Sequence, residues 1–598
     1  MSHNLLVGLS LIIVLGIAAQ WISWHFRLPS ILLLLIFGFI AGPITNILDP
    51  DFYFGELLFP IVSISVAVIL FEGGLSLKLS ELKIVGGVVR NLVTIGIFVT
   101  WVLSSLLAFY ILHFNLQISL LLGAILVVTG PTVVLPILRH VKPTGQINSV
   151  LKWEGIINDP IGALLAILVF EVLIAAGITE ATTQVLTGLL KTILISTTIG
   201  FAGGYLIVIL LRYNLIADFL QNSISLALVV IVFTSSQIIQ SESGLLAVTV
   251  MGIFLTNQKK VNVKHIIDFK ENLRVLLISV LFILLAARLK LSDLNLLNHN
   301  SFIYVGLLIL IVRPISVFLS SIKSPLKLKE KIYLSAMAPR GVVAAAITSI
   351  FVIKLGRAGV EGVDALVPLM FLIIVATISF YGLLSMPLAK WFKIANPNPQ
   401  GCLIIGAHPF AVAFGNQLKE NGYKVLLVDT NYANISFAKS QGLPAYYGSI
   451  VSENIMNDVD MNSIGKLLAL TPNQEVNSLA AIYFTKMFGG KDVYQLSIEE
   501  EEHKQGRNVS KELRGKILFG TGYTYSNIEN LFNDGYKISK TKFTDEFNYD
   551  KFKEMHNNKD IIPLFIIEKD KNLIIYTSDK KPEPAKGETL FYFNKDKK

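Results

Sequence analysis

The sequence predicts an all-α polytopic membrane domain with inverted repeats and two broken crossing helices. A cytoplasmic α/β Rossmann-like domain and a small β-rich module follow it. Only 16% of the 598 residues are charged, against about a quarter in soluble domains, and the deficit is confined to residues 1–392. Apolar runs of roughly the 20 residues that a bilayer requires follow one another there. Beyond that part, strand and helix patterns alternate over 398–510, and short strands fill 515–598.

About thirteen apolar runs are candidates for membrane-spanning helices. They begin near Leu5, Ile31, Leu58, Val93, Ile118, Gly155, Leu186, Ile216, Leu245, Leu273, Phe302, Ile332 and Leu366. With the N-terminus outside, the inner connections carry most of the Lys and Arg residues, as the positive-inside rule requires. An odd number of spans then places the C-terminal part in the cytoplasm. The first run lacks a basic start and a cleavage site, so we expect it to be retained as a span.

Charge and cysteine content exclude other classes of protein. The net charge of +9 is compatible with nucleic-acid binding, but the basic residues lie at the ends of apolar runs and form no nucleic-acid motif. We therefore expect a lipid bilayer as partner and no nucleic acid. The single cysteine, Cys402, excludes an intrachain disulfide framework and a cysteine zinc site.

The densest polar group inside an apolar run opens the sixth span and comprises Glu154, Asn158 and Asp159. A charge in the hydrocarbon region costs at least about 2.5–3.5 kcal/mol, so each one is a functional candidate. Glu154 and Asn158 are four residues apart and share a helix face. The alternative interpretation is a helix cap at the inner surface, where Asn and Asp are favoured.

Two other spans are interrupted at their centres. The fifth reads Thr129-Gly130-Pro131-Thr132, and the twelfth reads Pro339-Arg340-Gly341. Proline close to glycine breaks a helix, and the freed backbone groups then require surrounding protein or a water-filled cavity. If spans one to six and eight to thirteen are repeats, the breaks occupy matching positions, which indicates the mid-membrane ion site of a transporter. Two proline kinks with packing roles are the alternative.

Two arginines at membrane depth need anionic partners. Arg313 lies in the eleventh span and Arg340 in the twelfth break, and an isolated buried charge is costly. Glu154 is the expected partner of one or the other. Glu72 and Glu242 lie near span ends, and we interpret them as funnel or interfacial charges.

Eight segments of the membrane part together resemble the monovalent cation:proton antiporters of the NhaP and Na⁺/H⁺-exchanger type. They are Gly38–Pro43, Phe71–Leu77, Thr129–Thr132, Glu154–Pro160, Leu245–Leu255, Phe269–Leu289, Arg313-Pro314 and Ala338–Val342. The resemblance implies that Asp159 binds the cation or H⁺ in turn, and that Asn158 marks an electroneutral branch. It also implies that Glu154 forms a structural ion pair with an Arg, while Thr129 and Thr132 flank the ion site. A homodimer in a bacterial inner membrane, with no required cofactor, is expected on the same ground.

Two positions depart from the pattern of that family. Gly130 stands where many members have an acidic residue, and Gly155 stands where a Ser is frequent. Two side-chain oxygens of the usual cation shell are therefore missing, and water or backbone must replace them. We expect Na⁺ as the exchanged ion, with Li⁺ and K⁺ as alternatives.

A single exchangeable carboxylate is sufficient for coupled exchange. Asp159 cannot hold H⁺ and a metal ion well at once, so the two ions compete, and one charge of either kind gives 1:1 exchange. Oxygen ligands suit a hard alkali cation. The sequence contains no Cys or His cluster of the kind that binds a transition metal. The expected function is therefore secondary active antiport, not an enzymatic reaction.

The C-terminal part begins with a strand over Gly401–Ile405, a helical pattern and a second strand ending in Asp429. This βαβ opening resembles the regulator-of-K⁺-conductance (TrkA N-like) domain over 398–510. Its glycine fingerprint is degraded, so a domain that binds nothing or only mediates dimerisation is the alternative to one regulated by NAD(H) or by ATP/ADP. Residues 515–598 resemble the companion TrkA C-like module. The candidates for nucleotide contact are Gly406, Ala407, His408 and Asp429.

Two further functions are weighed against antiport. A nucleotide-gated K⁺ channel or efflux system would need a filter such as Thr-Val-Gly-Tyr-Gly, which the sequence lacks. A membrane-anchored NAD-dependent dehydrogenase would need an intact glycine fingerprint and a catalytic pair in the tail, and neither is visible in the sequence.

Overall fold

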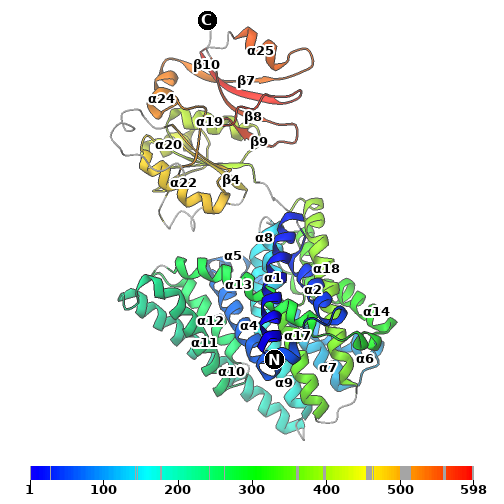
Figure 1. Ribbon diagram of the computed structural model, residues 1–598. Helices are drawn as coiled ribbons and strands as arrows, with labels where there is room; N and C mark the ends of the chain where they lie inside the picture. Colours follow the sequence, from blue (N-terminus) through cyan, green and yellow to red (C-terminus); the bar gives the residue numbers. More distant parts are fainter. Residues whose placement is uncertain are drawn as a thin grey trace. The chain divides into compact units, whose positions relative to one another are not determined.

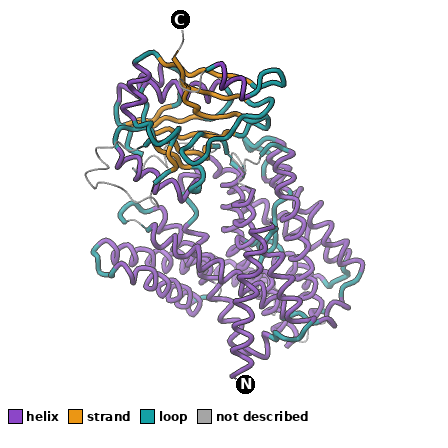
Figure 2. Tube along the Cα trace, turned by 45° about the horizontal axis from the view of Figure 1, so that its top comes forward, coloured by secondary structure: helices purple, strands orange, loops and turns teal. Residues whose placement is uncertain are grey.

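The computed structural model describes residues 2–26, 28–141, 143, 146–174, 178–241, 243–261, 263–357, 362–394, 399–450, 452, 461, 463–497, 514–556 and 561–595. The chain divides into two compact units, Met1–Ala395 and Asn396–Lys598. Helices make up the first unit, and strands occur in the second (Figure 2). The Lys- and Glu-rich stretch 498–513 and Glu242 lie outside the described residues.

The first unit is a set of apolar helices. Eight of its described helices are long and apolar enough to cross a bilayer, and five shorter apolar helices accompany them. The expected polytopic fold is therefore confirmed. The helices are α1 (Ser2–Phe26), α2 (Ser30–Phe39), α3 (Pro50–Phe54), α4 (Leu58–Leu75), α5 (Leu79–Asn91), α6 (Ile97–Ile111), α7 (Leu116–Ile125), α8 (Pro131–Val141), α9 (Ile147–Ile174), α10 (Ile178–Arg212), α11 (Gln221–Ile239), α12 (Ser243–Asn257), α13 (Lys264–Ala287), α14 (His299–Leu307), α15 (Arg313–Ser320), α16 (Leu328–Ser335), α17 (Val342–Arg357) and α18 (Leu366–Trp391).

These helices pack as two bundles. Helices α1, α2 and α4 contact α13, and α4 also packs on α12, which contacts α10 and α11. The second bundle contains α5–α9 and α14–α18. In Figure 1, α10–α12 lie on one side of the unit, and α6, α7 and α14 lie on the other. Helices α4 and α12 approach closely at Gly252, where a Cβ would lie 2.3 Å from the Phe71 carbonyl oxygen. Small residues allow such backbone contacts in membrane bundles.

The fourth and eleventh spans share an irregularity that sequence reasoning did not predict. A π-helical turn over Leu92–Gly96 joins α5 to α6, and another over Leu308–Val312 joins α14 to α15. Ser316 donates a hydrogen bond to the Gly96 carbonyl over 3.0 Å, and Asn91 donates to the Ser320 carbonyl over 3.1 Å. A hydroxyl group thus satisfies a carbonyl of the first turn, and a side-chain amide satisfies a carbonyl at the end of α15. The matching positions of the turns agree with two repeats.

The second unit opens with a doubly wound parallel sheet. Its strands lie in the order β3-β2-β1-β4-β5-β6, which is the order of dinucleotide-binding sheets. The strand–helix–strand opening expected from the sequence is confirmed. The elements are β1 (Gly401–Ile405), α19 (Pro409–Glu420), β2 (Val425–Asp429), α20 (Tyr432–Ser440), β3 (Ala445–Tyr447), β4 (Ile464–Ala469), α22 (Gln474–Phe488), β5 (Val493–Gln495) and β6 (Lys516–Ile517).

A four-stranded antiparallel sheet follows, in the order β7-β10-β8-β9. Its core is shared with the parallel sheet through α19: the ring centroids of Phe410 and Phe593 are 5.4 Å apart, and those of Phe414 and Phe565 are 5.0 Å apart. The β-rich tail is thus part of the same compact unit. Its elements are α24 (Tyr525–Asn533), β7 (Tyr536–Lys542), α25 (Tyr549–Met555), β8 (Ile561–Ile567), β9 (Leu573–Ile575) and β10 (Thr589–Lys595).

Candidate functional site

Helix α9 carries the polar trio of the sixth span deep inside the first unit. Glu154, Asn158 and Asp159 are 3%, 4% and 1% exposed, so the helix-cap interpretation at the inner surface does not describe them. Pro160 lies inside the helix and leaves the Ile156 carbonyl without its usual helical donor. The apolar residues that follow continue the same helix.

The two broken spans cross each other beside α9. The Gly130 amide donates to the Pro339 carbonyl over 3.1 Å, and the Arg340 guanidinium donates to the Val128 carbonyl over 3.1 Å. A Cβ on Gly130 would lie 2.5 Å from the Cα of Gly341. The backbones therefore touch, and the crossing has no room for a side chain at position 130.

Gly130→Ala should push the two crossing segments apart. Overpacking of this kind costs about 1–3 kcal/mol, and it would displace the groups around the ion site. We expect a lower unfolding temperature in detergent together with loss of exchange. Gly306→Ala in α14 is the matched control, because a Cβ there meets nothing within 4 Å. Equal behaviour of the two variants would contradict the close crossing.

Glu154 pairs with Arg313, which settles the choice between the two arginines. The guanidinium Nη1 and Nη2 lie 2.5 and 2.9 Å from the two carboxylate oxygens. Arg313 also donates to the carbonyls of Leu334 and Met337, over 3.1 and 2.9 Å, at the end of α16. Among the described residues, no ion pair joins Arg340 to a carboxylate. The expectation that Arg340 forms a structural ion pair is therefore wrong. Its guanidinium contacts the backbone of the fifth-span break instead.

Several buried oxygen atoms around the crossing have no hydrogen-bond partner among the described residues. Unpaired buried polar atoms are costly, and a cluster of oxygens is the ligand type that alkali cations prefer. Four residues of the expected site, two in the fifth span and two in α9, contribute them. The atoms are Thr129 Oγ1, Thr132 Oγ1, Asn158 Oδ1, and Asp159 Oδ1 and Oδ2. Their donor set fits a bare or partly hydrated cation.

A small polar cavity lies on the arginine side of this cluster. Its lining includes Thr129, Asn158, Glu154, Arg313 and Arg340, and its volume is about 10 Å³. That is close to the space one water molecule needs. A water there would reach Asn158 and Thr129, two of the groups left without a protein partner.

Two larger cavities lie between the helix bundles. One of about 620 Å³ is bounded by α1, α2 and α13 on one side and by α8 and α18 on the other. The second, of about 340 Å³, is bounded by residues of α3 and α13 on one side and of α17 and α18 on the other. Asp159 lines neither cavity. The candidate ion site at Asp159 is therefore separate from both cavities.

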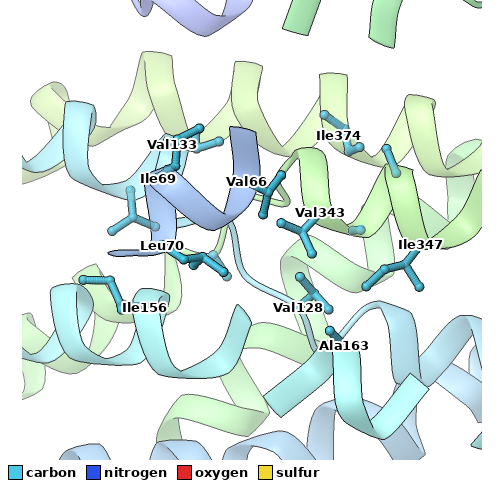
Figure 3. Packing of buried hydrophobic residues seen from close by; sticks show 14 of the residues in the cluster. Val66, Ile69, Leu70, Val128, Val133, Ile156, Ala163, Val343, Ile347 and Ile374 are labelled. Atoms are coloured by element: carbon cyan, nitrogen blue, oxygen red, sulfur yellow. The ribbon is translucent and has the colours of Figure 1, made fainter. Parts of the chain in front are cut away.

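Apolar side chains pack between α4 and the crossing. Val66, Ile69 and Leu70 of α4 lie near residues from the fifth, sixth, twelfth and thirteenth spans (Figure 3). All of these side chains are buried. They exclude water from the space between α4 and the crossing, where electrostatic interactions are therefore stronger. The residues that the three approach include Val128, Val133, Ile156, Ala163, Val343, Ile347 and Ile374.

A second buried ion pair was not predicted from the sequence. Glu72 in α4 lies 2.5 Å from the Arg274 guanidinium in α13, and the two residues are 7% and 4% exposed. The interpretation of Glu72 as a funnel or interfacial charge did not include this pairing, and Arg274 also lines the cavity of about 620 Å³ between α1, α2, α13, α8 and α18. The sequence does show two opposite charges at the ends of two apolar runs, which could have suggested the pair. Nothing in the sequence indicates that these two runs lie side by side.

The four nucleotide candidates lie together at the carboxyl end of β1. Gly406 has φ +98°, the left-handed region that suits glycine. The Ala407 amide donates to Asp429 Oδ2 over 2.8 Å, and His408 Nε2 lies 2.9 Å from the Leu470 carbonyl oxygen. The geometry thus brings all four residues together, and it engages Asp429 and His408 with the protein's own backbone.

Comparison with known proteins agrees with this architecture. Residues 9–391 match the sodium/hydrogen exchanger transmembrane family, and residues 402–509 match the TrkA-N domain. A K⁺/H⁺ antiporter NhaP of Alkalimonas amylolytica is 29% identical over 397 residues, covering 66% of this chain and 67% of the relative. Na⁺/H⁺ antiporter 1 of Methanocaldococcus jannaschii is 30% identical over 364 residues, covering 57% of this chain and 81% of the relative.

A solved structure gives the same result for the membrane part. The sodium proton antiporter MjNhaP1 of Methanocaldococcus jannaschii at pH 8 superposes with a TM-score of 0.58 at 24% identity, covering 64% of this chain and 98% of that one. The apolar helices make this a multi-pass membrane protein. The family model spans well over half of the chain. The chain therefore belongs to the sodium/hydrogen exchanger family of cation/proton antiporters, with a TrkA-N domain after its membrane part, and it is a transporter, not an enzyme.

Proposed function

We propose that this chain exchanges Na⁺ for H⁺ at Asp159, one ion for one. The observation that carries the proposal is the contrast between two carboxylates of α9. Glu154 is held by two hydrogen bonds from Arg313. Both oxygens of Asp159 are buried and lack a protein donor among the described residues. A buried carboxylate in that condition needs a neutralising partner, and either a proton or an alkali cation supplies one.

Competition for one carboxylate then couples the two ions. Asp159 carries one negative charge, and either H⁺ or Na⁺ cancels it, so exchange moves no net charge. Glu154 adds no second exchangeable charge because Arg313 neutralises it. Asn158, Thr129 and Thr132 supply neutral oxygens to the cation. They have no charge to lose or gain during the cycle.

Alternating access is supported by the cavities between the two bundles. Each cavity is bounded by one bundle on each side, so a rocking movement of one bundle would enlarge one cavity and narrow the other. The apolar packing of Val66, Ile69 and Leu70 against the crossing would block ion passage from one cavity to the other. Asp159 would meet one side of the membrane at a time.

K⁺ is the second candidate for the exchanged cation. The oxygens without partners include a single carboxylate, and the close contact of Gly130 with Gly341 leaves no room for another at that position. A site of low charge favours the less strongly hydrated ion. The relative from Alkalimonas amylolytica is named a K⁺/H⁺ antiporter, whereas the methanogen relative is named for Na⁺.

The surroundings of the transporter are part of the proposal. Lys and Arg residues gather in alternate connections, which supports an outside N-terminus and a cytoplasmic C-terminal unit. A bacterial inner membrane and a homodimer are proposed from the likeness to NhaP antiporters. The C-terminal unit, with a TrkA N-like part and a TrkA C-like module, would regulate exchange.

The test is proton movement in proteoliposomes with an internal pH dye. Na⁺, Li⁺ and K⁺ are added in turn, and the Na⁺ and Li⁺ measurements are made with and without a voltage clamp by valinomycin and K⁺. We expect Na⁺ to dissipate the pH gradient at a rate that the clamp leaves unchanged. If only K⁺ dissipates the pH gradient, K⁺ is the exchanged cation and the mechanism at Asp159 still holds. A rate that depends on the clamp would refute the 1:1 stoichiometry.

A further inference from the structure

The carboxyl ends of β1 and β4 border the crevice in which an open doubly wound sheet binds its ligand. In this chain a side chain spans that crevice. The His408 ring follows β1, and its Nε2 lies 2.9 Å from the carbonyl oxygen of Leu470, which follows β4. Because a carbonyl can only accept, Nε2 must carry the hydrogen. His408 is 7% exposed, so the ring fills space that a ligand would need.

Aromatic rings close the crevice from the side of the β-rich module. The Tyr525 ring meets the His408 ring edge to face, with centroids 5.0 Å apart. The Phe410 ring also stacks on the His408 ring, with centroids 6.2 Å apart. Tyr525 opens helix α24, and its hydroxyl donates to Glu529 one turn later over 3.3 Å. The histidine therefore ties the end of β4 to the first turn of α24.

The donors and acceptors that a dinucleotide uses are also engaged or missing. Pro409 occupies the first position of α19 and has no amide to offer a phosphate. Asp429, which would hold ribose hydroxyls, accepts instead from the amides of Ala407 and Asn431, over 2.8 Å each. The Asn434 side-chain amide donates to it as well, over 2.9 Å. The ribose site is thus filled by the chain itself.

We propose that the ligand of this crevice is the proton, bound by His408, and that the closed crevice admits no dinucleotide. In the neutral state the imidazole holds β4 and α24 together. A second proton on the ring would put a charge into a space lined by Tyr525 and Phe410. The closed arrangement would then open, and α24 would separate from the end of β4.

The direction of the effect follows from the surroundings of the ring. Burial lowers the pKa of His408, and the Leu470 carbonyl and the more distant Glu529 and Asp429 oppose that effect only in part. Closure is therefore fully stable above the ordinary histidine pKa of about 6.5. It weakens as the pH falls below that value, because the open form takes up the proton first. Acidification of the cytoplasm would open the crevice.

Opening would reach the rest of the β-rich module through α24. Ile528 of that helix is 3% exposed, and Phe532 stacks on Phe593 of β10 with ring centroids 6.3 Å apart. Ile528, Phe532 and Phe593 belong to the core shared by the two sheets. Release of Tyr525 would therefore expose the first turn of α24 before it affected the strands.

Hydrogen/deuterium exchange of the full-length protein in nanodiscs tests the proposal. Peptides covering Tyr525–Asn533 are compared at pH 8 and pH 6, after correction for the intrinsic pH dependence of exchange. We expect protection to fall at pH 6 in the wild type. His408→Gln, whose amide can still donate to Leu470, should keep its protection at both pH values. His556→Gln, at the residue that follows helix α25 in the same unit, is the control and should behave as the wild type.

Nucleotide binding and transport provide two further readouts. NAD⁺, NADH and ATP, each at millimolar concentration, should leave the unfolding temperature of the wild-type chain unchanged at pH 8. The ratio of the cation/proton exchange rates at pH 6 and pH 8 should differ between the wild type and His408→Gln. Thermal stabilisation by a nucleotide, or equal loss of protection in wild type and His408→Gln, would overturn the proposal. Failure of the ion site alone would abolish transport and leave the deuterium result intact.

Discussion

Asp159→Asn should abolish cation-dependent proton movement to the level of empty liposomes. The amide has nearly the shape of the carboxylate, but it carries no charge for a cation and no exchangeable proton. The fold should tolerate the change, because neither Asp159 oxygen has a protein hydrogen-bond donor among the described residues. We therefore expect an unfolding temperature equal to that of the wild type or above it. Dye-based exchange and thermal unfolding in detergent measure the two parts.

Glu171→Gln is the matched control for this variant. Glu171 lies on the same helix, α9, and its side chain is exposed, so neutralising it should change neither exchange nor stability. Residual exchange in Asp159→Asn that responds to Na⁺ or K⁺ would remove Asp159 from the mechanism. Loss of both activity and folding would mean that the carboxylate has a structural partner.

Glu154→Gln should produce the largest loss of stability. It leaves the Arg313 guanidinium buried without a counter-charge, and breaking a buried pair in this way costs about 3–5 kcal/mol. The expected result is a clear fall in unfolding temperature, with little folded protein recovered. Arg313→Lys should also be destabilised, because an ammonium group cannot reproduce the paired hydrogen bonds to the carboxylate. Thermal unfolding and size-exclusion profiles of the detergent-solubilised protein measure both.

Asp51→Asn is the comparison that separates burial from charge. Asp51 pairs with Arg288 over 2.9 Å, but the two side chains are 52% and 25% exposed. Pairs in contact with solvent contribute about 0–1 kcal/mol, so this variant should unfold within a few degrees of the wild type. A fall as large as that of Glu154→Gln would contradict the assigned depth of the Glu154–Arg313 pair.

The spans and the first strands of the tail could be predicted because their signals are local. Each apolar run contains its own evidence for crossing a bilayer, and the run Gly401–Ile405 contains its own evidence for a buried strand. Strand β7, Tyr536–Lys542, was not predicted. Its sequence combines partly exposed residues with three lysines. This pattern is typical of a protected edge strand, but a surface loop has the same composition.

The site was predicted in its composition but not in its pairing. Polar residues in apolar runs identified Glu154, Asn158 and Asp159, since a charge in lipid requires a reason. Arg313 and Arg340 were equivalent candidates for Glu154, because the sequence gives the sign of a charge and not its distance from another. The pairing of Glu72 with Arg274 stayed hidden for the same reason.

By itself, the sequence determined that this is a polytopic membrane protein with two interrupted spans, one candidate ion-binding carboxylate and a Rossmann-like tail. Hydropathy, helix-breaking residues and strand periodicity are properties of neighbouring residues, so they can be read along the chain. Only the tertiary structure decided which arginine neutralises Glu154, how closely Gly130 and Gly341 cross, and that His408 fills the crevice of the tail. Each of these depends on segments far apart in sequence, and their contact is set by packing.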